Sequence, residues 1–168
     1  MRHWVEVSKA NRRARRMADH HYTFRPGGKR MSHEVGPPGQ KIVFLTSDDK
    51  AVWGSHRPAP WAGIVRSDRL EGLFCFLFRN EGYPHAPSSI LIQEAVGLTA
   101  LRWGLDDFWT YVAKEHVQSS NPGYCYLEAG FKHNGWVESK KLGVLRRLVM
   151  VKTDVERLAT QHMREMQC

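Results

Sequence analysis

The stretch GLFCFLFRNEGYPHAPSSILIQEAVGLTALRWGLDDFWTYVA, residues 72–113, decides the fold of this chain. Its apolar run at residues 72–79 is typical of a strand buried on both faces of a sheet. A loop then leads to a helix predicted over residues 88–103, which Gly104 ends, and residues 108–113 predict a further strand. Strand, helix and strand in this order predict a βαβ unit with a parallel pair of strands, and therefore the α/β fold class.

Three elements are predicted before this unit. Ser8 is a plausible N-cap for a basic amphipathic helix that runs to about Tyr22, because the Arg-Pro-Gly-Gly sequence at residues 25–28 cannot continue it. Residues 41–46 and 51–55 predict two strands joined by a tight turn. The first half of the chain is therefore expected to contribute a helix and a β-hairpin.

Four elements are predicted after the unit. Asn121 and Pro122 are suited to the N-cap and first position of a short helix. Residues 131–137 and 142–151 predict a closing hairpin, and residues 153–166 a polar amphipathic helix.

The bulk composition favours one intracellular domain. A chain of 168 residues without repeats, low-complexity tracts or interior linkers predicts a single domain spanning residues 1–168. No apolar run approaches the ~20 residues of a membrane helix, and the start MRHWVEVSKANRR lacks the apolar core of a signal peptide. The cysteines Cys75, Cys125 and Cys168 form no CxxC pair and are expected to be free thiols. A cytoplasmic protein with no membrane partner is therefore expected.

Positive charge is concentrated at the start of the chain. The net charge is +8, and residues 1–30 hold nine Lys/Arg against Glu6 and Asp19, which leaves the remainder nearly neutral. Such asymmetry favours a polyanionic partner, either nucleic acid or the phosphates of a large cofactor, and the alternative is a solubilising face. The nucleic-acid-binding candidates are Arg12, Arg13, Arg16, Lys29 and Arg30.

The loop and helix start at residues 83–90 predict an anion site. Backbone N–H groups and the helix dipole at a helix N-terminus both favour phosphate. Ser88 and Ser89 either cap this helix or contact a phosphate.

The segment NPGYCYLEAGF, from Asn121 to Phe131, resembles the ending of the GNAT N-acyltransferases, in which a short helix bears Asn, Tyr and a terminal Gly-Phe. The spacing of Tyr126, Gly130 and Phe131 matches that ending. The resemblance covers about residues 8–151, and the order of elements agrees throughout. It implies a GNAT-like α/β fold, a mixed central sheet flanked by helices, and an acyl-CoA-dependent N-acyltransferase that uses acetyl-CoA or another acyl-CoA. The residues that this implies for cofactor binding are Tyr83, His85, Ala86, Ser88, Ser89, Asn121 and Tyr124.

One departure from the family indicates a divergent branch. The usual pyrophosphate loop, Gln/Arg-x-x-Gly-x-Gly/Ala, is replaced by Tyr83-Pro-His-Ala-Pro-Ser-Ser89. The segments Asp19-His20-His21-Tyr22 and Gly54-Ser55-His56-Arg57-Pro58, with Asn121-Pro-Gly and Ala-Gly-Phe131, are similar to phage and prophage GNAT-like proteins, including the Mom-type DNA-modification proteins. That similarity implies action in a bacterial host, on a base in phage DNA or an amine already attached to one.

Acyl transfer from a thioester needs a base for the amine, polarisation of the carbonyl and an acid for the departing thiolate. Tyr126 is the candidate acid, with a packed aromatic ring as the alternative. Glu115 and His116 follow the carboxyl end of a predicted strand and are candidate bases. His20 and His21 are the rival pair, of which His21 is retained as a catalytic candidate.

Two further groups of residues have structural alternatives. His20, His21 and His33 match no metal-ligand spacing, so no metal site is predicted. Trp53, Trp61 and Trp109 either stack a base or belong to the core.

Three functions remain open on the sequence. The first is an acyl-CoA N-acyltransferase acting on DNA. The others are an acetyltransferase for a small amine, and a non-catalytic nucleic-acid-binding module on a GNAT scaffold. The sequence does not predict an oligomeric state.

Overall fold

The computed structural model describes residues 2–21, 33–58, 63, 66, 68–117 and 120–167. The chain divides into two compact units, Met1–Ala86 and Pro87–Cys168.

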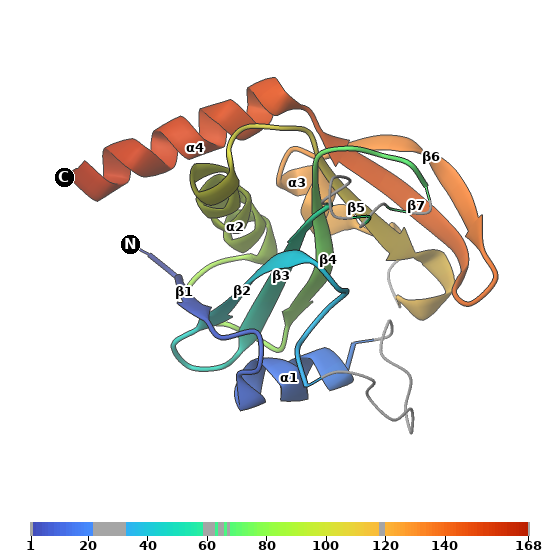
Figure 1. The fold of residues 1–168 in the computed structure, drawn as a ribbon, viewed down its shortest axis with the longest axis horizontal. Helices are drawn as coiled ribbons and strands as arrows, with labels where there is room; N and C mark the ends of the chain where they lie inside the picture. Colours follow the sequence, from blue (N-terminus) through green and yellow to red (C-terminus); the bar gives the residue numbers. More distant parts are fainter. Residues whose placement is uncertain are drawn as a thin grey trace. The chain divides into compact units, whose positions relative to one another are not determined.

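The first unit contains four antiparallel strands that pair in chain order: β1 (Trp4–Val7), β2 (Gln40–Thr46), β3 (Ala51–Arg57) and β4 (Leu73–Asn80) (Figure 1). Phe44 of β2 lies opposite Trp53 of β3, and Trp53 lies opposite Phe78 of β4. Directly opposed residues project to the same face, so these large rings line one face of the strands.

The helix α1 (Arg12–Asp19) packs on the other face. Its buried Ala14, Met17 and Ala18 join a core cluster with Val43 of β2 and Val52 of β3. The small and apolar residues of α1 recur at helical spacing, which turns Arg12, Arg13 and Arg16 toward solvent.

Phe76 interrupts the pairing of β3 with β4. Gly54 pairs with Leu77 and Ser55 with Cys75, so Phe76 forms a bulge. Its ring covers the backbone of Gly54, because a Cβ added there would overlap the ring. Only glycine fits at this position.

The second unit has three antiparallel strands in the order β5 (Phe108–Ala113), β7 (Gly143–Met150) and β6 (Lys132–Ser139). A 3₁₀ turn, Lys114–His116, follows β5, and the short helix α3 (Tyr124–Glu128) precedes β6.

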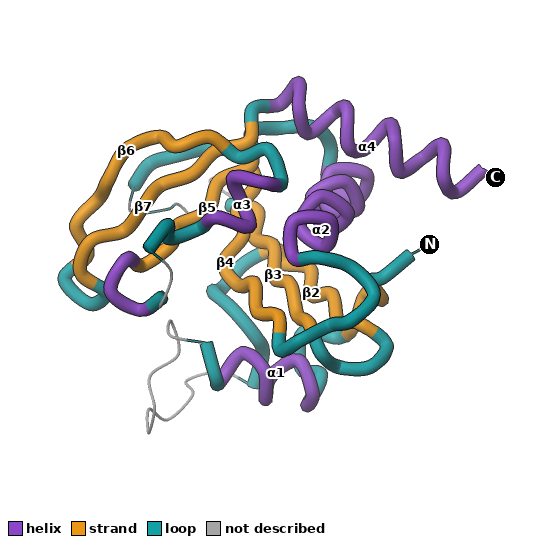
Figure 2. Tube along the Cα trace, turned by 180° about the vertical axis from the view of Figure 1, so that it is seen from behind, coloured by secondary structure: helices purple, strands orange, loops and turns teal. Residues whose placement is uncertain are grey.

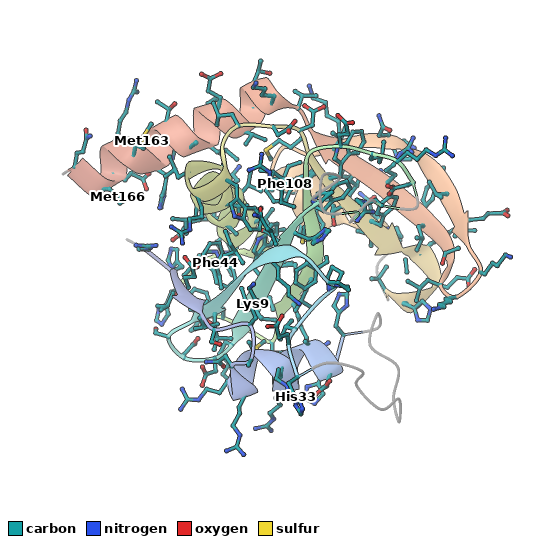
Figure 3. All side chains as sticks on the ribbon, viewed as in Figure 1. Lys9, His33, Phe44, Phe108, Met163 and Met166 are labelled. Atoms are coloured by element: carbon teal, nitrogen blue, oxygen red, sulfur yellow. The ribbon has the colours of Figure 1, made fainter. Side chains whose placement is uncertain are left out.

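Two long helices of this unit, α2 (Ser88–Trp103) and α4 (Lys152–Gln167), lie side by side (Figure 2). They approach closely at Gly97, where an added Cβ would lie 3.2 Å from the Leu158 carbonyl oxygen. After the buried His162, residues 163–167 of α4 are exposed, and Met163 and Met166 project near its end (Figure 3). Neither α2 nor any other helix in the described residues is long and apolar enough to cross a membrane.

Most predicted elements are confirmed. The first hairpin, the strands at residues 72–79 and 108–113, the helix over 88–103, the closing hairpin and the tail helix all form, within a few residues of the predicted ends. The single domain over residues 1–168 stays a prediction.

Three details at the helix ends and at the start of the chain were wrong. The first helix begins after Asn11, whose Oδ1 accepts from the N–H groups of Arg13 and Ala14, and Ser8 is not its cap. It ends at Asp19. The strand β1 was not predicted, because a four-residue strand is too short to show a clear alternation of apolar and polar residues.

Candidate functional site

The helix α3 holds the candidate acid, Tyr126, in a packed position. Tyr126 is 7% exposed, and its ring meets Phe131 edge to face at 5.4 Å between centroids. Phe131 in turn meets Phe108 of β5 at 6.3 Å. The ring of Tyr126 therefore has a fixed orientation within the second unit.

The Gly130-Phe131 pair ends α3 by backbone geometry. Gly130 has φ +103°, in the left-handed range that favours glycine, and the Phe131 N–H donates to the Tyr126 carbonyl oxygen at 3.0 Å. This turn brings Phe131 back against Tyr126. The spacing of the motif thus has a structural consequence, which is the aromatic contact that orients the tyrosine.

Gly123 places the start of α3 directly on the strands. It is the N-cap, with φ +82°, and the N–H groups of Tyr126 and Leu127 donate to its carbonyl oxygen. A Cβ at this position would lie 2.9 Å from Leu148 Cδ1 and 3.1 Å from Val112 Cγ2. The prediction of Asn121 as N-cap is therefore wrong, since the chain needs a residue without a side chain at the point of closest approach.

A hydrogen bond joins α3 to α2. Gln93 Nε2, in the second turn of α2, donates to the Ala129 carbonyl oxygen at the end of α3, at 3.3 Å. The N-terminal part of α2 is thereby held next to the helix that carries Tyr126.

The N-terminus of α2 has the character of an anion site. Its N-cap is Pro87, which makes no side-chain cap hydrogen bond, and its first turn holds no acidic residue. Ser88 and Ser89 are the first two helical residues, so the prediction that they cap the helix is wrong, and the alternative, that they contact a phosphate, stays a prediction.

The other predicted loop residues, Tyr83, His85 and Ala86, belong to the first unit. The Tyr83 hydroxyl lies 2.9 Å from His3 Nδ1, and the Tyr83 ring meets His85 edge to face at 5.2 Å. Asn80 Oδ1 accepts from the N–H groups of Gly82 and Tyr83, which fixes the turn after β4. Aromatic and histidine rings thus occupy this loop.

The predicted bases Glu115 and His116 lie in the exposed 3₁₀ turn after β5. The Glu115 carboxylate lies over Gly143 at the start of β7, where an added Cβ would be 2.8 Å from Oε2. Gly143 therefore makes room for this carboxylate, which is turned toward the β6–β7 hairpin.

Asn121 and Tyr124, two predicted cofactor residues, have defined partners. Asn121 Oδ1 accepts from Arg146 Nη1 of β7 at 2.6 Å, and the Pro122 carbonyl oxygen accepts from the same nitrogen at 2.9 Å. Tyr124 is 55% exposed, and the charge of Glu128, together with a hydrogen bond to it, raises the pKa of Tyr124. Tyr124 is thus a protonated hydroxyl at neutral pH, and Asn121 serves to anchor the turn before α3.

His20 and His21 belong to the first unit. Burial, with a smaller contribution from the charge of Arg79, lowers the pKa of His21 to about 4. A group with that pKa is neutral at pH 7 but a weak base, which disfavours His21 for proton abstraction. His20 Nδ1 lies 3.3 Å from Glu81 Oε1.

The basic face of α1 is exposed. Arg12, Arg13 and Arg16 project to solvent, and Arg13 pairs with Asp49 at 2.9 Å. Lys29 and Arg30 lie outside the described residues, as does Trp61. Trp53 is fully buried and belongs to the core. The described residues contain no group of three His, Cys, Asp or Glu suited to a metal ion.

Sequence reasoning missed a cluster beside α3 in the second unit. Trp136 of β6 is 50% exposed, and Lys114 Nζ and Arg146 Cζ lie 5.9 and 5.8 Å from its ring centroid. The His133 ring lies 5.4 Å away. We refer to Trp136, Lys114, Arg146 and His133 as the Trp136 patch. The sequence feature that could have indicated this patch is the positive charge of residues 132–147, which hold five Lys/Arg against one acidic residue, Glu138.

Comparisons with known proteins concern the fold. No protein-family model and no curated protein sequence matches the chain. A chimera of the spermidine N-acetyltransferase SpeG from Vibrio cholerae with hSSAT is similar in structure, with a TM-score of 0.50 and 12% identity over 70% of this chain and 72% of that one. SpeG from Vibrio cholerae in complex with CoA and spermine has a TM-score of 0.44 and 15% identity, over 69% of this chain and 67% of that one. At such identities a likeness shows the fold alone. The predicted fold class is confirmed: the chain has the GNAT α/β fold.

Proposed function

We propose that this protein is an acyl-CoA-dependent N-acyltransferase whose chemistry is carried by the second unit. The observation that carries the proposal is the hydrogen bond from Gln93 of α2 to the Ala129 carbonyl oxygen of α3. It ties a helix N-terminus suited to phosphate to the helix that bears Tyr126. A pyrophosphate-containing thioester and its proton donor need this kind of adjacency.

The residues at the start of α2 fit the phosphates of an acyl-CoA. The first turn lacks the acidic side chain that would repel them, and the helix dipole favours negative charge there. Ser88 and Ser89 supply hydroxyl and N–H donors at this helix end.

The acyl-CoA supplies a thioester carbonyl open to attack by an amine. Glu115, with His116 as its neighbour, accepts the proton from the attacking nitrogen as the N–C bond forms. Tyr126 gives its hydroxyl proton to the sulfur as the C–S bond breaks, so that the products are an amide and a free thiol. Tyr126 later regains its proton from solvent.

The acceptor that we propose is an amine on DNA, as a base or an attached group. The net charge of +8 and the exposed arginines of α1 favour an anionic partner, since they attract phosphate without reading sequence. Spermidine, the acceptor named for the structurally similar enzymes, is a polycation, and this charge would repel it.

The experiment is thiol release from acetyl-CoA, followed with a thiol reagent, in the presence of single-stranded DNA bearing primary amines and, separately, spermidine. We expect faster thiol release with the amine-bearing DNA than with spermidine. Tyr126→Phe should lower kcat by about 100- to 10,000-fold, the usual contribution of a positioned acid or base, while acetyl-CoA binding is kept.

Leu127→Ala is the matched control, because it lies on the same helix but not at the proposed acid. Full activity in Tyr126→Phe would refute the assignment of the acid. Greater activity with spermidine than with DNA would refute the acceptor and favour a small-amine acetyltransferase.

A further inference from the structure

We infer that the Trp136 patch is a binding platform for single-stranded DNA, on which Trp136 stacks a base while Lys114 and Arg146 neutralise the neighbouring phosphates. This inference deepens the proposed function and rests on it for the choice of DNA as the strand that is bound.

An exposed indole between two cations matches the chemistry of a nucleotide strand. A strand alternates a planar base with a phosphate, and the patch places a half-exposed ring within 6 Å of two positive groups. In the described part of the chain no carboxylate pairs with Lys114 or Arg146. Their charge is therefore available to an anion.

Arg146 makes the patch rigid. Its Nε donates to His133 Nδ1 at 3.3 Å, and its Nη1 donates to Asn121 Oδ1 and to the Pro122 carbonyl oxygen. A side chain that is already fixed loses little conformational entropy when a strand binds.

The patch lies on the same face of the strands as α3. Arg146 is directly opposite both Trp136 of β6 and Val112 of β5, so the three side chains project to one side. Gly123, the N-cap of α3, packs against Val112 on that side. A base stacked on Trp136 would thus bind beside the helix that carries Tyr126, which is where an acceptor strand is needed.

A single strand suits the patch better than a duplex. The faces of bases in a duplex are covered by their neighbours, so stacking on a protruding ring needs an unpaired base. The turn of the surrounding hairpin is also basic, with Lys140 and Lys141 exposed, which would attract the backbone beside the stacked base.

The test is fluorescence anisotropy of a labelled oligothymidylate of about 12 nucleotides, a length within the usual range of strand-binding sites. Trp136→Ala should weaken binding about 5- to 150-fold, the equivalent of one base stack, and Trp136→Phe should restore part of it. Thermal unfolding of each variant checks that the fold is kept.

Lys114→Gln and Arg147→Gln form a matched pair of charge variants. Arg147 lies opposite Tyr111 in the register and therefore projects to the other face of the strands. Lys114→Gln should reduce the slope of log K against log salt by about 0.7, and Arg147→Gln should leave the slope unchanged.

Unchanged binding in Trp136→Ala, or equal losses in the two charge variants, would overturn the inference. Duplex DNA that binds as tightly as the single strand, with no dependence on Trp136, would also overturn it.

Acetyl-CoA titrations of the same proteins separate the two proposals. If the wild-type protein binds acetyl-CoA but not the oligonucleotide, only the proposed DNA platform is refuted. If it binds the oligonucleotide but not acetyl-CoA, only the proposed transferase activity is refuted. A loss of acetyl-CoA binding in Trp136→Ala would assign the patch to the coenzyme and overturn the inference.

Discussion

Gly123→Ala tests whether close packing at the N-cap places α3. The new Cβ would lie 2.9 Å from Leu148 Cδ1, closer than real Cβ contacts, and 3.1 Å from Val112 Cγ2, which is tighter than most of them. The residue would also hold a left-handed conformation, which costs about 1–2 kcal/mol for alanine. Overpacking a filled site adds about 1–3 kcal/mol. We expect the free energy of unfolding to fall by about 3 kcal/mol.

The control is Gly135→Ala, which shares the backbone cost without the overlap. Gly135 has φ +99°, and an added Cβ would meet only Arg147 Nη2, at 4.0 Å. Urea unfolding followed by circular dichroism gives both values, and the difference between them measures the packing contribution. The double variant Gly123→Ala with Leu148→Val removes the contacted methyl group. Its loss in the free energy of unfolding should therefore be smaller than the sum of the losses in the two single variants. Equal losses in the two single variants would refute the packing argument.

The remaining predictions concern the first unit. His21 has its pKa lowered from 6.5 to about 4, so the unfolded chain binds more protons between these values and stability falls as the pH falls through this window. Between pH 7 and pH 5 the titration of His21 should lower the free energy of unfolding by about 2 kcal/mol. In urea unfolding, His21→Gln should lack this part of the pH dependence. A pH dependence equal to that of the wild type would contradict the lowered pKa of His21. Asn11→Ala should cost about 1 kcal/mol through loss of the cap, and Ser8→Ala clearly less, whereas the reverse order in thermal unfolding would contradict the observed helix start.

The regular elements were predictable because their patterns are local. The apolar run at residues 72–79, the helix over 88–103 and the turn between residues 46 and 51 each carry their own periodicity or turn residues, and each forms as expected. Helix caps were less predictable, because Ser8, Asn11, Asn121 and Gly123 are all acceptable N-caps by residue type. Tertiary contact decides among them, as the approach of Gly123 to Val112 illustrates.

The Trp136 patch shows why the candidate site was only partly predictable. The part of the chain after residue 30 is close to neutral as a whole, and this average concealed the basic hairpin of residues 132–147. Trp136 and Lys114 are far apart in sequence and meet only through the register of β5, β7 and β6. Tyr126 could be chosen beforehand because its spacing to Gly130 and Phe131 resembles a family motif. Its edge-to-face contact with Phe131 could be identified only in the folded structure.

The central claim is that this GNAT fold binds an acyl-CoA, and calorimetric titration of the purified protein with acetyl-CoA, beside free coenzyme A, tests it most directly. The account predicts micromolar affinity for acetyl-CoA, and weaker affinity in Ser88→Glu, which places negative charge at the start of α2. No binding would contradict the account and would favour a nucleic-acid-binding module that keeps the scaffold without the chemistry.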